Sequence, residues 1–188
     1  RQEMRIDFVI LLRKLLMTIS HRPLRSALYI PGSKPRALEK ARNLPTDSII
    51  FDLEDAVSAE SKSEARVILR AALAQGGYGA RLKIVRINAL NTPWGEADLQ
   101  ELDGLDVDAV LLPKVNSAGD LDALANVVGA KWPLWAMLET PLGIFNAGEI
   151  AAHPLLQALV AGTNDLAKDL KCQLTLTRDS LQMALQAL

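Results

Sequence analysis

The sequence is poor in the residues and patterns that mark several classes of protein. It has one cysteine, Cys172, which cannot form a disulfide within the chain and favours a reducing compartment. Its 21 Lys and Arg residues are balanced by 22 Asp and Glu residues, so it lacks the concentrated positive charge that nucleic-acid binding requires. The longest run without charge, residues 150–164, is interrupted by His153 and Pro154 and is too short to span a membrane. We therefore expect neither nucleic acid nor membrane as a partner, and a cytoplasmic location.

Several common functional motifs are also missing. Neither G-x-G-x-x-G nor G-x-x-x-x-G-K-[ST] occurs, which argues against a nucleotide-binding site of those kinds, and no Ser-His-Asp order or zinc-ligand spacing is present. Aromatic residues make up only 4% of the chain, so the core must be built from aliphatic residues and alanine. With 49% hydrophobic and 23% charged residues over 188 positions, the composition is that of one globular domain.

The two ends of the chain differ from this body. Residues 4–17 are apolar with basic interruptions and lack the continuous apolar stretch of a signal peptide. We expect residues 1–23 to be an N-terminal extension or short helix, and residues 24–188 to be the catalytic domain. Residues 178–188 have a helical pattern with no stop signal after it, so we expect this domain to be partial.

Short apolar, β-branched runs alternate with helical patterns through the body. Apolar residues on both faces of such runs are typical of strands in a parallel sheet covered by helices. The expected strands are Ala27–Ile30, Ser48–Leu53, Lys83–Asn88, Ala109–Pro113, Leu134–Glu139 and Ala158–Gly162. The expected helices are Pro35–Asn43, Ser61–Ala74, Gly95–Leu102, Ser117–Val128 and Ile144–Ala151. Ser61 and Glu64 have the spacing of a capping box, and Gly76-Gly77 should end that helix.

Polar residues follow all six expected strands. They are Pro31-Gly32-Ser33, Asp52-Leu53-Glu54-Asp55, Arg86-Ile87-Asn88, Pro113-Lys114, Glu139-Thr140 and Gly162-Thr163-Asn164-Asp165. The carboxyl ends of the strands of a (β/α)₈ barrel gather in one mouth, whereas an open doubly wound sheet concentrates such groups at one or two crevices. We therefore predict an α/β fold of the TIM (β/α)₈-barrel type that is truncated after about six βα units.

Glu139 and Asp165 end neighbouring expected strands, so both carboxylates should face the same part of the mouth. Two like charges at short distance repel each other unless a cation joins them or one group stays protonated. No His or Cys stands beside them, and a site with only oxygen ligands favours a hard ion such as Mg²⁺. The alternative is that Glu139 caps a helix beginning near Thr140-Pro141 and that Asp165 begins the next helix.

Arg86 ends an otherwise apolar strand and needs an anionic partner, because a buried unpaired charge is very costly. A substrate carboxylate or phosphoryl group is one possible partner. An ion pair with the acidic turn, residues 52–55, is the alternative, and both can hold together. For Asp55 we expect a local capping role, and Asp52 or Glu54 could support the metal ligands from behind.

Gly162-Thr163-Asn164 leads into Asp165 and an expected helix N-terminus. Free backbone N–H groups there would form an anion cradle beside the metal, and glycine allows the backbone to approach closely.

Four basic residues are placed near these motifs. Lys62 and Arg66, one helical turn apart, are the expected counter-ions of the acidic turn. Arg25 and Lys34 flank the loop of the first strand and are candidates to bind a phosphorylated cofactor. The alternative for this last pair is that both are solvated surface charges.

The strand ends also carry longer motifs in a fixed order. These are Arg25-Ser26-Ala27-Leu28-Tyr29-Ile30-Pro31-Gly32, Asp52-Leu53-Glu54-Asp55-Ala56-Val57 with Lys62 and Ala65-Arg66, Val85-Arg86-Ile87-Asn88, Leu112-Pro113-Lys114, Leu138-Glu139-Thr140-Pro141 and Gly162-Thr163-Asn164-Asp165-Leu166. Together they resemble the citrate lyase β-subunit-like branch of the HpcH/HpaI aldolase family. The resemblance extends from Leu24 to about Leu188.

This resemblance implies a Mg²⁺-dependent (β/α)₈ barrel that cleaves or forms carbon–carbon bonds in 3-hydroxyacyl thioesters carried on CoA or acyl carrier protein. By motif, it implies Glu139 and Asp165 as metal ligands, Arg86 as the substrate-binding and catalytic arginine, Gly162, Thr163, Asn164 and Asp165 as the carboxylate cradle, and Arg25 and Lys34 near the thioester carrier. In the family an acidic residue for proton transfer lies on a C-terminal segment, often from a neighbouring subunit, that has no counterpart in these 188 residues. Glu54 is a weak substitute for it.

We therefore expect a Mg²⁺-dependent carbon–carbon lyase that converts a citryl-, malyl- or citramalyl-type thioester to a keto acid and an acyl thioester. Two alternatives remain open. One is a thioesterase or synthase that uses the same metal site, and the other is a non-catalytic substrate-binding fragment. The family resemblance also implies a homo-oligomer, a trimer or larger.

Overall fold

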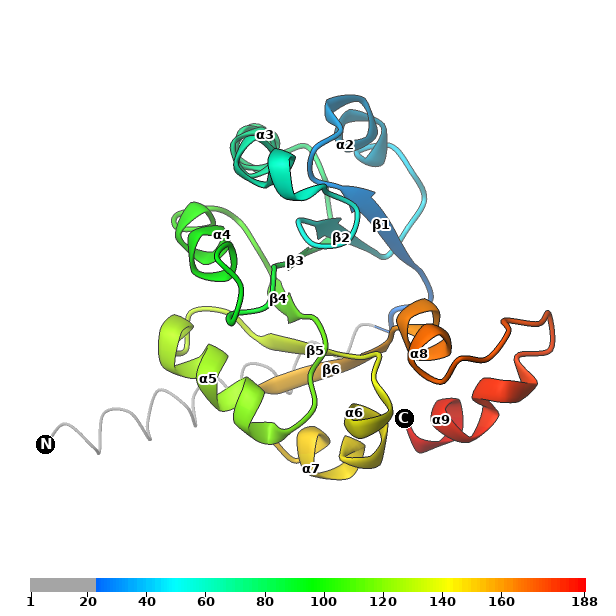
Figure 1. The fold of residues 1–188 in the computed structure, drawn as a ribbon. Coiled ribbons are helices and arrows are strands. Elements are labelled where there is room, and N and C mark those ends of the chain that lie inside the picture. Colours follow the sequence, from blue (N-terminus) through cyan, green and yellow to red (C-terminus); the bar gives the residue numbers. More distant parts are fainter. Residues whose placement is uncertain (1–22) are drawn as a thin grey trace, which may run out of the picture.

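The computed structural model describes residues 23–188, so all of the expected N-terminal extension except Pro23 lies outside the described residues. Strands and helices alternate along the chain (Figure 1). The strands are β1 (Ala27–Pro31), β2 (Ser48–Asp52), β3 (Leu82–Arg86), β4 (Ala109–Leu112), β5 (Leu134–Leu138) and β6 (Leu156–Ala161). The α-helices are α2 (Pro35–Ala41), α3 (Lys62–Gln75), α4 (Gly95–Glu101), α5 (Ala118–Val128), α6 (Pro141–Phe145), α7 (Ala147–Ala151), α8 (Thr163–Asp169) and α9 (Gln182–Ala187), with 3₁₀ turns at Ala59–Ser61 and Asp179–Leu181. Within the described residues, no helix has the length and apolar character needed to cross a bilayer.

All six strands form one parallel sheet in which each strand pairs with the next along the chain, in the order β1-β2-β3-β4-β5-β6. Figure 1 shows the strands as an inner arc with helices outside it, and the arc is open between β1 and β6. Consecutive parallel strands joined by outer helices are the arrangement of a (β/α)₈ barrel. The predicted fold class is therefore confirmed, and within residues 23–188 the barrel-type sheet has six strands and is not closed.

Side chains at alternate strand positions divide into two cores. The larger core lies between sheet and helices and includes Ile49, Phe51, Val85, Val110, Leu112, Ala136 and Leu138 from the strands. The smaller core lines the inner face of the arc and consists of Ile50, Ile84, Ala109, Leu111, Trp135 and Met137. Because side chains alternate with a period of two, the next inner-face positions on β2, β3 and β5 belong to Asp52, Arg86 and Glu139. The strand period thus carries these charged groups to the carboxyl-terminal edge of the inner face.

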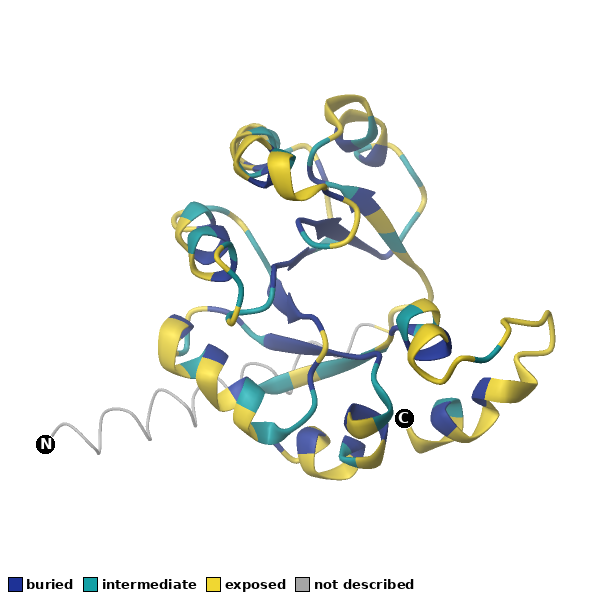
Figure 2. Ribbon diagram, in the orientation of Figure 1, coloured by how far each residue is buried: buried dark blue, intermediate teal, exposed yellow. Residues whose placement is uncertain are grey.

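Burial follows the position of each strand in the arc. Every residue of β2, β4 and β5 is buried, whereas β1 and β6 mix exposed and partly buried residues (Figure 2). The reason is that β1 and β6 each have a neighbouring strand on one side only. Fully buried strands therefore position Asp52, at the end of β2, and Glu139, directly after β5.

Three local predictions had different outcomes. Gly76 ends α3 with φ +69°, as expected. The capping box predicted at Ser61 is wrong, because a 3₁₀ turn precedes α3 and the Ser61 side chain caps nothing. The single helix predicted over Ile144–Ala151 is also wrong: α6 and α7 meet at Asn146, whose amide donates a hydrogen bond to the Asn116 carbonyl at 2.7 Å.

Candidate metal and substrate site

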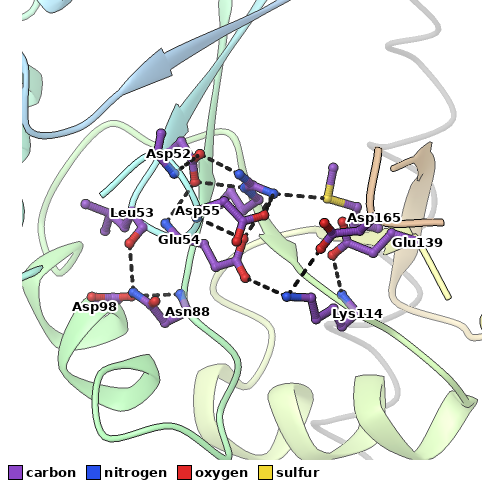
Figure 3. Close-up of polar contacts among 12 residues, drawn as sticks. Asp52, Leu53, Glu54, Asp55, Asn88, Asp98, Lys114, Glu139 and Asp165 are labelled. Carbon is purple, nitrogen blue, oxygen red and sulfur yellow. Dashed lines mark hydrogen bonds and ion pairs between the residues drawn. The ribbon is translucent and has the colours of Figure 1, made fainter. Parts of the chain in front are cut away.

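One cavity of about 470 Å³ lies at the carboxyl ends of the strands. Its walls come from β1, β2, β3, β5 and β6 and the residues that follow them: Tyr29, Asp52, Asp55, Ala56, Arg86, Met137, Glu139, Ala161, Gly162, Thr163, Asn164 and Asp165. The structure therefore brings the predicted metal ligands, the predicted arginine and the predicted cradle to one place. Figure 3 shows the polar contacts around it.

Arg86 at the end of β3 lies in register with Asp52 at the end of β2, and the two form a bidentate ion pair. Nε of Arg86 donates to Oδ1 at 2.8 Å and Nη2 donates to Oδ2 at 2.5 Å. The same carboxylate accepts the backbone N–H groups of Glu54 and Ala56 at 2.8 and 3.1 Å. Asp52 therefore fixes both the arginine and the start of the acidic turn. The local cap that we predicted for Asp55 is made by Asp52 instead.

The third nitrogen of the guanidinium, Nη1 of Arg86, lies 3.1 Å from Glu54 Oε2 and 3.5 Å from Asp55 Oδ2. The Tyr29 ring also contacts this guanidinium, at 5.6 Å from Cζ to the ring centroid. Burial disfavours the charge, but the hydrogen bonds that Arg86 donates to Asp52 and the charges of the nearby carboxylates outweigh it, so the pKa of Arg86 is raised. The ion-pair alternative is thus realised, and the arginine remains a permanent cation on the cavity wall.

Two buried groups hold the acidic turn from behind. Nζ of Lys62 donates to the carbonyl oxygens of Leu53 and Glu54 at 2.8 and 2.6 Å. Nδ2 of Asn88 donates to the same Leu53 oxygen at 2.9 Å (Figure 3). Burial lowers the pKa of Lys62. Lys62 is therefore a partner of backbone carbonyls, and its predicted ion pair with the carboxylates is replaced by these bonds.

Arg66 is not a counter-ion of the acidic turn, and that prediction is wrong. Its Nη1 lies 3.2 Å from Oδ1 of Asp98, a fully buried residue of α4. Oδ2 of Asp98 accepts both the backbone and side-chain N–H groups of Asn88, at 2.8 and 2.7 Å. Asp98 thus orients Asn88, which in turn supports the acidic turn.

Glu139 follows β5 and is only 2% exposed. Its Oε1 accepts the backbone N–H of Lys114 at 2.9 Å, and no described residue donates a hydrogen bond to Oε2. Burial raises the pKa of Glu139 to about 7, although the Lys114 bond opposes the rise. Thr140 caps α6 through its Oγ1, so the alternative that Glu139 is the helix cap is wrong. Gly162 lies against the Glu139 side chain and leaves room for it.

Asp165 lies in the first turn of α8, as the alternative reading of this residue predicted, and it also lines the cavity. Nζ of Lys114 lies 3.4 Å from Asp165 Oδ2 and 3.3 Å from Glu54 Oε1 (Figure 3). Burial alone would lower the pKa of Lys114, but Glu54 and the other carboxylates raise it to about 12. One lysine therefore links both candidate metal ligands, Glu139 through its backbone and Asp165 through its side chain.

The donor set fits a hard divalent cation. The candidate ligands are oxygen atoms only, and Oε2 of Glu139 faces a glycine, where a Cβ atom would approach it to 2.6 Å. Within residues 23–188, no three His, Cys, Asp or Glu side chains form a complete metal site. A cation held by Glu139 and Asp165 would therefore take its other ligands from water and substrate, which is typical of Mg²⁺.

The two predicted carrier-binding residues lie at opposite ends of the strands. Arg25 precedes β1, and its Nη2 pairs with Asp47 Oδ1 at 3.1 Å, at the amino ends of the strands and away from the cavity. Lys34 follows β1 and is the N-cap residue of α2, exposed at the same edge as the cavity. Lys34 therefore shares this end of the strands with the cavity, but it is not among the residues that line it.

Sequence reasoning assigned no role to three residues of this region. Tyr29 and Met137 line the cavity, and Lys114 pairs with Asp165 of its wall and with Glu54. Burial raises the pKa of Tyr29 to about 12. The strand period was the available signal for Met137, which lies two positions before Glu139. For Lys114 the signal was its place in a strand-end motif.

Residues 25–188 match the family model described as HpcH/HpaI aldolase/citrate lyase. The chain is 53% identical over 163 residues to a (3S)-malyl-CoA thioesterase of Cereibacter sphaeroides, an alignment that covers 87% of this chain and 57% of the relative. It is 36% identical over 167 residues to an L-malyl-CoA/beta-methylmalyl-CoA lyase of the same species, covering 82% and 52%. The chain thus spans little more than half the length of these curated relatives.

A solved structure with the same fold is the citrate lyase beta subunit from M. tuberculosis, complexed with oxaloacetate and magnesium. The TM-score is 0.71 at 29% identity, over 86% of this chain and 70% of that one. The family match covers nearly all described residues, and it agrees with the six strand-end motifs and with the parallel sheet. The chain belongs to the HpcH/HpaI aldolase/citrate lyase family.

Proposed function

We propose that this chain provides the metal- and acid-binding site of an enzyme that acts on malyl-type CoA thioesters. The observation that carries the proposal is the placement of Glu139, Asp165 and Arg86 on one cavity. A malyl thioester has a carboxylate and a hydroxyl group on neighbouring carbons, and the cavity offers a cation site and an arginine for them. Relatives named for malyl-CoA, at 53% and 36% identity, support this substrate class.

A magnesium ion held by Glu139 and Asp165 would supply Lewis-acid chemistry to the substrate oxygens. Arg86 has a separate task. Its bond to Asp52 fixes the guanidinium plane, so the charge on the cavity wall is already in place where negative charge develops on the substrate. Preorganised charge of this kind needs no rearrangement during the reaction.

The start of α8 contributes backbone donors to the same wall. The Gly162 N–H is not available, because it donates to the Leu138 carbonyl at 3.0 Å. Thr163 and Asn164 also line the cavity, and their N–H groups, as the first of the helix, have no partner within it. We propose that they bind the carboxylate of the substrate.

Glu54 is the group that we propose for proton transfer. It lies between Arg86 and Lys114, its side chain is 12% exposed, and burial raises its pKa. A carboxyl group with a raised pKa exchanges protons more readily near neutral pH. In hydrolysis it would accept a proton from the attacking water, and in carbon–carbon cleavage it would accept the hydroxyl proton of the substrate.

Hydrolysis is the first reaction to test, because the relative at 53% identity is named a thioesterase. It would add water to malyl-CoA and release malate and free CoA thiol. Carbon–carbon cleavage is the second, because the relative at 36% identity is named a lyase. It would release glyoxylate and acetyl-CoA. An assay for free thiol and a separate assay for glyoxylate distinguish the two, and binding without either product would indicate a substrate-binding chain.

Calorimetry with Mg²⁺ and oxaloacetate or glyoxylate tests the site itself. We expect Glu139→Gln and Asp165→Asn each to abolish Mg²⁺-dependent binding of the oxo acid. Asp169→Asn, an exposed change on the same helix as Asp165, is the matched control and should bind like the unmodified protein. Unchanged affinity in both Glu139→Gln and Asp165→Asn would refute the assignment.

A further inference from the structure

Lys114 is the described cation that touches Asp165. Its ammonium group lies 3.4 Å from Asp165 Oδ2 and 3.3 Å from Glu54 Oε1, and its side chain is 45% exposed. The buried cation of the cavity wall, Arg86, has two of its nitrogens committed to Asp52. The ammonium of Lys114 is thus the positive charge that offsets Asp165 (Figure 3).

The backbone of Lys114 has a different task from its side chain. The residue has φ +52°, an uncommon conformation for a residue with a side chain, and in it the N–H points to Glu139 Oε1 at 2.9 Å. This bond persists whatever the side chain does, because it belongs to the main chain. The orientation of Glu139 and the charge beside Asp165 are therefore two separable contributions of one residue.

We propose that Lys114 is a built-in counter-ion that competes with a divalent cation for the Asp165 carboxylate and thereby sets the metal affinity of the site. The inference rests on the proposed function in one respect, namely that Asp165 is a metal ligand. A divalent cation on Asp165 and an ammonium on the same carboxylate repel each other at these distances. Since the lysine stem is flexible and partly exposed, the ammonium can move toward Glu54 and solvent when a cation arrives.

This inference predicts the sign of a charge-removal experiment. Lys114→Met keeps the length and apolar stem of the side chain, keeps the backbone N–H, and removes the charge. Loss of a positive charge within a few ångströms of a ligand should tighten Mg²⁺ binding by about tenfold or more. If Lys114 instead served to hold Asp165 in a binding position, the same variant would bind Mg²⁺ more weakly.

Mg²⁺ affinity measured by calorimetry, without substrate, is the readout. Lys114→Arg retains the positive charge and places another residue with a side chain at the positive φ. Its Mg²⁺ affinity should stay within about twofold of that of the unmodified protein, because the local charge is unchanged. Lys168→Met removes an exposed charge from α8 and controls for net charge. Thermal unfolding provides the second measurement: Lys114→Met should melt at a lower temperature without Mg²⁺ and show a larger Mg²⁺-induced rise.

Three outcomes overturn the inference. Equal or weaker Mg²⁺ affinity in folded Lys114→Met, with normal binding by the unmodified protein, refutes the competing role of Lys114 and leaves the proposed function intact. If Lys168→Met tightens Mg²⁺ binding as much as Lys114→Met does, the change in affinity reflects the net charge of the protein and not the position of Lys114. Absence of Mg²⁺ binding in both the unmodified protein and Lys114→Met refutes the proposed metal site, and the inference falls with it.

Discussion

Gly162 packs directly against the carboxylate side chain of Glu139. A Cβ atom at position 162 would lie 2.4 Å from Cβ and 2.6 Å from Oε2 of Glu139, closer than any real Cβ contact. Gly162 has φ −91°, so its backbone would accept other residues without strain. The requirement for glycine at this position is therefore one of space, and the three atoms nearest to an added Cβ all belong to the Glu139 side chain.

Gly162→Ala should displace the Glu139 carboxylate and weaken Mg²⁺-dependent oxo-acid binding by at least about tenfold, because a misplaced ligand loses its share of the coordination. Calorimetry gives the affinity, and circular dichroism shows whether the fold is kept. Gly148→Ala is the matched control, since a Cβ atom there meets nothing within 4 Å. This control lies in α7 and should leave binding unchanged. Wild-type affinity in Gly162→Ala would show that Glu139 does not hold the cation.

Arg86→Lys should keep the positive charge but lose the bidentate pairing with Asp52, because an ammonium group cannot donate along two parallel lines. We expect oxo-acid affinity to fall at least about tenfold, and the free energy of unfolding to fall by about 1–3 kcal/mol, the range for a buried polar group that loses a partner. Calorimetry and urea unfolding measure the two effects. If oxo-acid affinity remains unchanged while stability falls, Arg86 is a structural ion-pair partner only.

Lys62→Met should reduce stability through the acidic turn. The buried ammonium donates to the carbonyl oxygens of Leu53 and Glu54, and each of these oxygens has one other donor, Asn88 Nδ2 for Leu53 and the Val57 N–H for Glu54. Removing the ammonium should lower the free energy of unfolding by about 1–3 kcal/mol. Lys40→Met, an exposed change on α2, should alter it by less than about 0.5 kcal/mol. Similar stability of the two variants would argue against this support for the turn.

The raised pKa of Glu139 predicts how stability depends on pH without a divalent cation. The folded protein holds the Glu139 proton up to about pH 7, whereas the unfolded chain releases it near 4.5. Between these values the folded state binds more protons, so the free energy of unfolding falls as the pH rises. Glu139→Gln should remove this contribution, and the comparison isolates it from the other carboxyl groups. Urea unfolding at pH 4.5 and pH 7 measures it, and identical pH dependence in both proteins would contradict the assignment.

Much of the candidate site was predictable because strand periodicity is local. Asp52, Arg86 and Glu139 each follow a buried inner-face residue by two positions. Because side chains alternate between the two faces of a strand, these three also lie on the inner face, at the carboxyl ends of the strands. The order of strand-end motifs then indicated that these positions meet.

The partners of the basic residues were not predictable in this way. Arg66 and Lys62 lie on one helix face, and proximity along the chain suggested the acidic turn for both. Arg66 pairs instead with Asp98, because α3 packs against α4 and brings the two side chains together. A contact between two helices produces no pattern in the sequence of either helix. Arg25 lies two positions before β1, and its pairing with Asp47 depends on how β1 and β2 align.

The strand order also bears on how related chemistries arise. Each described strand pairs only with its neighbours in the chain, and five of the six, all except β4, contribute their own groups to the cavity. A loop after one strand can therefore be exchanged during evolution while the groups on the remaining strands keep their places. Hydrolases and lyases could then descend from one ancestor that binds the cation and the acid in the same way. Changes confined to single loops would decide which reaction takes place.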